Sequence, residues 1–109
     1  MRYIEIDKET IPYKFDMALA GDTYTFYVNY NTQGDFFTID LYKNDKVIVL
    51  GEKIVYGRQL FSSYQYKNIP KVPIIPLDLA GNTERITFDN MNKDVFLFLI
   101  EGDDNEILD

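Results

Sequence analysis

Two stretches in the first half of the chain alternate apolar and polar side chains with a period of two. In residues 22–30 the alternate apolar positions are Tyr24, Phe26, Val28 and Tyr30. In residues 35–43 they are Phe37, Ile39 and Leu41. Successive side chains of a strand point to opposite faces, whereas a helix repeats every 3.6 residues. The pattern therefore predicts β-strands, and no helical period is sustained along the sequence.

Short polar segments separate these strands. Residues 20–22 divide an alternating stretch over 13–19 from the strand beginning at Thr23, and residues 31–34 divide the next pair. Residues 43–46 lead into a fourth strand over 47–50. Gly, Asn and Asp tolerate the left-handed backbone of tight turns. Four strands joined in this way predict an antiparallel hairpin meander.

Aromatic side chains occur on both faces of these strands. Tyr27, Phe36 and Tyr42 fall on the face opposite to Phe26 and Phe37. An antiparallel sheet with one face in water carries mainly polar residues on that face. We therefore expect part of the second face to be covered by another strand layer or by a partner.

The second half of the sequence is less regular. A short strand is expected over 52–56, followed by an irregular aromatic stretch over 60–66. Pro70, Pro73 and Pro76 occupy every third position, which fits an extended polyproline-like backbone or an edge strand lacking ladder donors. We expect an ordered arm that wraps the sheet or a partner, in preference to a flexible linker.

The remaining predicted elements are short. Strands are expected over 77–79 and 85–88, and Asp89 is expected to cap one helical turn over 90–93. Residues 95–100 are continuously apolar, which predicts a central strand buried on both faces.

Together these elements predict an all-β, mainly antiparallel fold. With 109 residues the chain has material for one core, so we expect a single domain over residues 1–109. The domain is expected to be a small β-barrel or sandwich built on the hairpin meander, with a proline-containing extended segment. The acidic end, residues 102–109, is expected to be a frayed tail.

Composition excludes several functions. Without Cys or His the chain has no disulfide, thiol nucleophile or imidazole, so the usual zinc sites are excluded and no metal is expected. A net charge of -7 is the wrong sign for binding nucleic acid. The first eight residues do not resemble a signal peptide, and the longest apolar stretch is far shorter than the roughly 20 residues that cross a membrane. We expect a soluble chain made in the cytoplasm, with no membrane partner.

Two weaker hypotheses, glycoside hydrolysis and calcium binding, depend on carboxylate side chains. Two acids about 5 to 9 Å apart can hydrolyse glycosides without histidine, but the sequence selects no such pair. In the tail, Asp103, Asp104 and Glu106 are oxygen donors that lack the spacing of a calcium loop. Solvation is the favoured role for both groups, so we expect no catalytic residues.

The aromatic content is a stronger signal of binding. The chain has nine Tyr and eight Phe, more than one small core needs. The surplus rings are Tyr27, Phe36, Tyr42, Phe61, Tyr64 and Tyr66. Tyrosine combines a rigid apolar body with a polar tip and is enriched at protein interfaces. We favour a protein interface as the explanation for these surplus rings over a core that is unusually rich in aromatic residues.

Several segments, in order and spacing, resemble a family of small phage and prophage tail proteins. They are YIEI at 3–6, IPYKF at 11–15, LAGDTY at 19–24, NYN at 29–31, GDFFTIDLY at 34–42, Gly57 with Leu60 and Phe61, and IPLD at 75–78. The family is that of the baseplate plug, first described in a cyanophage contractile tail. The resemblance covers nearly the whole chain except the acidic tail.

The resemblance implies a structural virion component of the tail baseplate, without enzymatic activity or cofactor. It implies hub or spike proteins as partners and, by analogy with their threefold symmetry, three copies or a multiple of three. The residues alone also fit a small binding module for a carbohydrate or a host protein, and more weakly a carboxylate-dependent hydrolase.

The predicted partner surface lies in residues 60–76. It consists of Phe61, Tyr64, Tyr66, Ile69 and Val72. Prolines exclude this segment from a central strand, and a preorganised backbone lowers the cost of binding. The alternative is that these rings close one end of the chain's own core.

Overall fold

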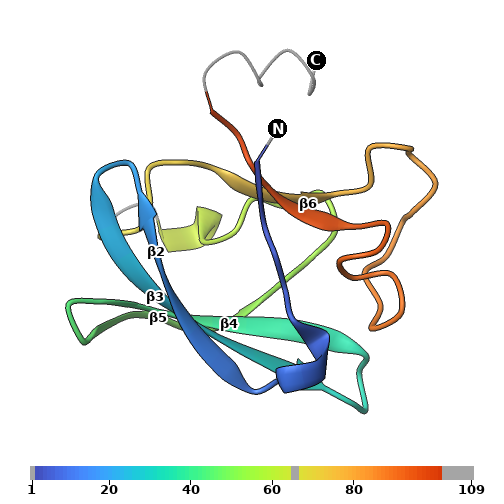
Figure 1. Ribbon diagram of the computed structural model, residues 1–109, viewed down its shortest axis with the longest axis horizontal. Coiled ribbons are helices and arrows are strands. Elements are labelled where there is room, and N and C mark those ends of the chain that lie inside the picture. The colour runs from blue at the N-terminus through green and yellow to red at the C-terminus, as the bar shows by residue number, and fades with distance from the viewer. Residues whose placement is uncertain (1, 65–66, 102–109) are drawn as a thin grey trace.

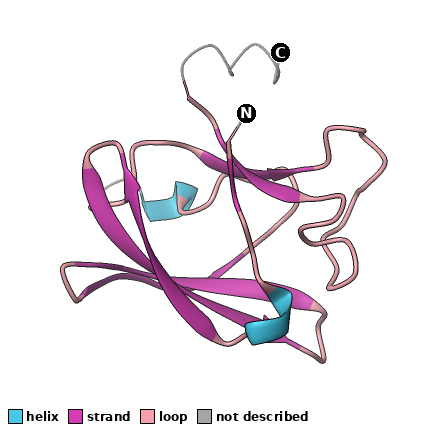
Figure 2. Cartoon of the chain, in the orientation of Figure 1, coloured by secondary structure: helices cyan, strands magenta, loops and turns pink. Residues whose placement is uncertain are grey.

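The computed structural model describes residues 2–64 and 67–101, so Tyr66 and the predicted tail over 102–109 lie outside the described residues. Two antiparallel sheets form the fold (Figures 1 and 2). The first contains, in spatial order, β2 (Tyr13–Leu19), β3 (Asp22–Asn31), β4 (Phe36–Lys43) and β5 (Lys46–Lys53). The second contains β1 (Tyr3–Ile4), β7 (Phe96–Leu99) and β6 (Ile74–Leu77). Two 3₁₀ turns, η1 (Lys8–Thr10) and η2 (Ser62–Tyr64), are the helical elements of the described residues.

The four-stranded sheet is the predicted hairpin meander, which is confirmed. Phe26 lies opposite Leu41 and Val28 opposite Ile39, all on one buried face. The prediction of two separate strands over 47–50 and 52–56 is wrong, because β5 runs unbroken through Gly51. Gly51 has a φ of +69°, and the ladder between β4 and β5 shifts register in this region. A glycine within a strand often marks such an irregularity without ending the strand.

The three-stranded sheet has β7 at its centre, as the apolar stretch over 95–100 predicts. β6 is an edge strand over Ile74–Leu77. The prediction of a strand over 77–79 is therefore wrong, because the strand ends at Leu77. The carbonyl groups of Ile74 and Pro76 accept hydrogen bonds of 2.8 Å from the backbone N–H groups of Leu60 and Gly57. In a strand, the N–H and the C=O of one residue point to the same side. The C=O of Pro76 points away from β7, so the N–H that proline lacks would also have pointed away from β7, and the ladder between β6 and β7 loses no hydrogen bond.

The two sheets pack face to face as a small sandwich, not a closed barrel (Figure 1). Side chains from both inner faces form one core, which includes Ile4, Phe26, Phe37, Ile74 and Leu97. Each of these residues is at most 3% exposed. The core therefore holds together sheets that share no strand.

The connection between β6 and β7 differs from the prediction. Residues 85–88 form no strand and residues 90–93 no helical turn. Instead the side-chain oxygen of Asn90 accepts from the N–H of Thr87 at 2.8 Å, and the N–H of Asn90 donates to the Thr87 hydroxyl at 3.2 Å. These side-chain bonds accompany the backbone hydrogen bonds of tight turns, in which the carbonyl of Asn90 accepts from the N–H groups of Lys93, Asp94 and Val95.

Candidate functional site

The outer face of the four-stranded sheet carries three half-buried aromatic rings. We use "outer face" for the side that bears Tyr27, Phe36 and Tyr42. Its register pairs Tyr42 with Thr25 and Phe36 with Asn31. The three-stranded sheet packs on the opposite side, and the described residues place no strand on this one. The expected second strand layer over this face is therefore absent from the described part of the chain, which leaves a partner as the remaining expectation.

A hollow of about 410 Å³ lies on the outer face. Its lining combines two tyrosine rings with polar and charged groups of both signs, namely Lys14, Asp16, Thr25, Tyr27, Tyr42 and Asp45. The Thr25 hydroxyl donates a hydrogen bond of 2.6 Å to Asp16, which fixes the carboxylate between β2 and β3. Such a lining suits recognition of a protein surface, because aromatic anchors and charges of both signs can find partners there.

The predicted partner residue Phe61 lies in the core. Its side chain is 1% exposed, and its ring centroid is 6.5 Å from that of Phe26. Its backbone has a φ of +64°, and its N–H donates a 2.6 Å hydrogen bond to the Glu52 carboxylate. The alternative role, closure of the chain's own core, therefore applies to this residue.

The other predicted partner residues lie at the margin of the core. Tyr64, Ile69 and Val72 are each half-buried and pack against core residues. The ammonium group of Lys67 lies 5.3 Å from the centre of the Tyr64 ring. All three side chains therefore lie against the core, and their contact with a partner stays a prediction.

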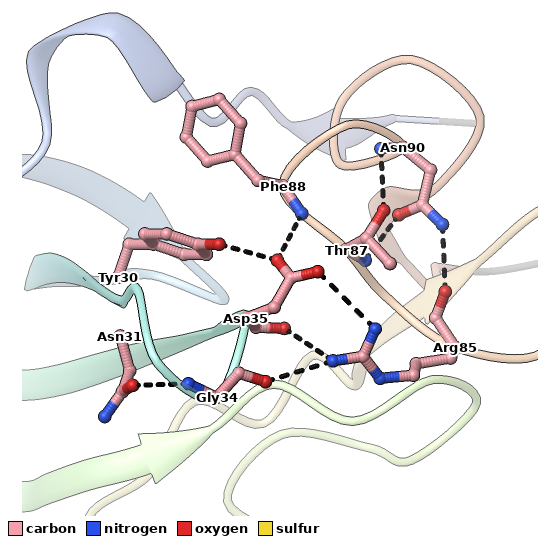
Figure 3. A network of polar contacts seen from close by, with 8 residues as sticks. All are labelled: Tyr30, Asn31, Gly34, Asp35, Arg85, Thr87, Phe88 and Asn90. Atoms are coloured by element: carbon pink, nitrogen blue, oxygen red, sulfur yellow. Dashed lines mark hydrogen bonds and ion pairs between the residues drawn. The ribbon is translucent and has the colours of Figure 1, made fainter.

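A polar network that the sequence did not reveal links the two sheets (Figure 3). Asp35 accepts hydrogen bonds from the Tyr30 hydroxyl at 2.6 Å and from the backbone N–H of Phe88 at 2.8 Å. Arg85 donates to the carbonyl groups of Gly34 and Asp35 at 3.0 and 3.2 Å. The hydrogen bond from Tyr30, followed by that from Phe88, lowers the pKa of Asp35. The only local signal is the Gly34-Asp35 turn, which does not indicate a partner 50 residues away.

The carboxyl groups with shifted pKa values do not suit acid catalysis. The Thr83 hydroxyl lowers the pKa of Asp78, and Arg2 lowers that of Glu101. A glycosidase acid needs a raised pKa to hold its proton near neutral pH. In the described ranges no group of three or more acidic side chains is arranged to hold a metal ion. The calcium reading of Asp103, Asp104 and Glu106 lies outside the described residues.

No helix in residues 2–64 and 67–101 is long and apolar enough to cross a membrane. The fold and the outer face together define a small all-β domain with a surface that suits binding to another protein.

The chain belongs to the family described as cyanophage baseplate Pam3 plug gp18, whose model matches residues 1–103. No curated protein matches the chain. Family membership makes it a baseplate plug protein, a structural component of the virion tail that contacts other baseplate proteins. The resemblance seen in the sequence is therefore confirmed, as is the non-enzymatic role it implied.

Proposed function

We propose that the outer face of the four-stranded sheet is the surface through which the plug binds the hub or the spike of the tail. The observation that carries this proposal is the row of half-buried rings, Tyr27, Phe36 and Tyr42, on a face that no strand of the described residues covers. Aromatic residues are enriched at protein interfaces, and Tyr is among the residues that most often dominate the binding energy. Tyr64 provides a second contact of the same kind, at the margin of the core.

The copy number in this proposal is three or a multiple of three. It follows from the threefold symmetry that the family resemblance implies for the hub and spike, because a plug that contacts them repeats with their symmetry. An image reconstruction of the tail tip gives this number directly. A single copy, or a number not divisible by three, contradicts it.

Paired tyrosine variants test the outer face. We expect Tyr27→Ala with Tyr42→Ala to lower the amount of plug in purified tails at least about tenfold, measured by mass spectrometry against the tube protein. The melting temperature is expected to fall only slightly, because both rings lie outside the core. Leu79→Ala is the control, since Leu79 is a 56% exposed apolar residue in the connection after β6, outside the outer face. Normal incorporation of the paired variant refutes the proposal for this face.

A further inference from the structure

The N-terminal segment has an open strand edge. β1 pairs on one side with β7, where the N–H of Leu99 donates to the carbonyl of Arg2 at 2.9 Å. Alternate residues of an extended chain point their backbone groups the same way, so those of Tyr3 and Glu5 point away from β7. Among the described residues no hydrogen bond is made by the backbone of Glu5. An unpaired edge of this kind is a template for another strand.

The open edge faces β2 across a groove. Two residues on from Glu5, the N–H of Asp7 points the same way and donates a 2.9 Å hydrogen bond to the hydroxyl of Tyr13 at the start of β2. Figure 1 shows the N-terminal segment and β2 leaving η1 in different directions. A groove of about 630 Å³ lies between them.

The floor of this groove is apolar and its rim is acidic. Tyr13 and Phe15 lie on the core side of β2 but are only half-buried, because the three-stranded sheet does not cover them fully. Their rings stack with centroids 5.8 Å apart. Glu5, Asp7 and Glu9 line the rim.

The one lysine of the groove does not balance this charge. The ammonium group of Lys8 donates to the carbonyl oxygens of Phe88 and Asp89 at 2.7 and 3.4 Å, which directs it to the loop before β7. Burial, and to a smaller extent the charges of Asp7 and Glu5, raises the pKa of the Tyr13 hydroxyl. The groove therefore combines a free strand edge, half-buried rings and a negative rim.

We propose that this groove receives an extended segment of another baseplate protein, a segment in which apolar and basic side chains alternate. Its backbone pairs with the groups of Tyr3 and Glu5, and strand addition of this kind gives affinity through main-chain hydrogen bonds. Its apolar side chains cover Tyr13 and Phe15, and its basic side chains face Glu5 and Glu9. This contact is separate from the outer face, so it stands or falls independently of the proposal for Tyr27 and Tyr42.

A nine-residue peptide of alternating Lys and Val, titrated onto the full chain at low salt, tests the proposal. We expect a dissociation constant below about 1 mM by fluorescence anisotropy, with amide shift changes confined to residues 3–7 and 13–17. A peptide of the same sequence with every second amide N-methylated is expected to bind at least about tenfold more weakly, because it lacks ladder donors. A peptide with Glu in place of Lys is expected not to bind.

Charge-reversed variants supply the matched comparison. Glu5→Lys with Glu9→Lys is expected to weaken binding of the Lys and Val peptide at least about fivefold, while Glu84→Lys, an exposed carboxylate outside the groove, leaves it unchanged. Absence of binding, equal binding of the Glu peptide or the N-methylated peptide, or shift changes elsewhere on the chain would each overturn the proposal.

Discussion

The backbone N–H of Phe88 donates a 2.8 Å hydrogen bond to the carboxylate of Asp35, which lies 53 positions earlier in the chain. Asp35 precedes β4, whereas Phe88 lies in the connection that leads to β7. The Phe88 ring packs 5.1 Å from that of Tyr30. Since the sheets share no strand, this contact fixes one end of the sandwich by a polar anchor beside the apolar core.

We expect Asp35→Asn to lower the melting temperature by several degrees at pH 7, because a neutral amide accepts more weakly from Tyr30 and Phe88. The pKa of Asp35 is lowered in the folded state. Its stabilisation is therefore present above the unfolded pKa of about 3.9 and is lost as the pH falls through the lower folded pKa. The gap in melting temperature between the two proteins should shrink from pH 7 to about pH 2.5, as followed by circular dichroism.

Asp94→Asn is the control for this comparison, because Asp94 is exposed and its side chain makes no hydrogen bond in the described structure. Its melting temperature should follow that of the unchanged protein at every pH. A gap for Asp35→Asn that stays constant down to pH 2.5 would show that the charge of Asp35 is not what stabilises the fold.

Strands with local partners were predictable from the sequence, because hairpin register is set by neighbouring residues. The alternation at Phe26 and Ile39 identified both the strands and their buried face. The connection over residues 85–93 was not predictable, since its conformation depends on Asp35 and Lys8, which are distant in sequence. Local propensity carries no information about such contacts.

The candidate site was predictable only in part. The surplus of aromatic residues correctly suggested that Tyr27, Phe36 and Tyr42 are not all absorbed by the core, because they alternate with buried positions. The same argument did not show that Phe61, unlike these three residues, lies in the core. Phe61 lies in an irregular segment, where no period shows which side chain points inward.

A substitution of Gly51 tests whether this glycine is needed for the irregular register of β5. We expect Gly51→Ala to lower the free energy of unfolding by about 1 kcal/mol, measured by urea denaturation, because a φ of +69° strains any side chain. The space around an added Cβ is open, so strain is the only cost. Gly51→Asn should cost less, since Asn tolerates this conformation. Equal or higher stability of the Ala variant would contradict the role given to this glycine.

A substitution of Phe61 tests whether its ring belongs to the core. We expect Phe61→Ala to lower the free energy of unfolding by about 3 to 5 kcal/mol, because removal of a fully buried ring leaves a cavity. Phe36→Ala is the matched control and should cost clearly less, since that ring is half-buried on the outer face. Equal losses for the two variants would remove the distinction between core and surface rings.

Tyr64 tests whether residues 60–76 contact a partner. The ring is half-buried, so Tyr64→Ala should lower the melting temperature only modestly. As an interface anchor it should nevertheless weaken binding to the purified hub at least about tenfold, a loss of about 1.4 kcal/mol. Titration calorimetry at a temperature where the variant is fully folded separates this effect from unfolding, and Arg58→Ala, an exposed residue nearby, serves as the control. If the folded variant binds the hub as tightly as the unchanged protein, Tyr64 belongs with Phe61 to the closure of the core.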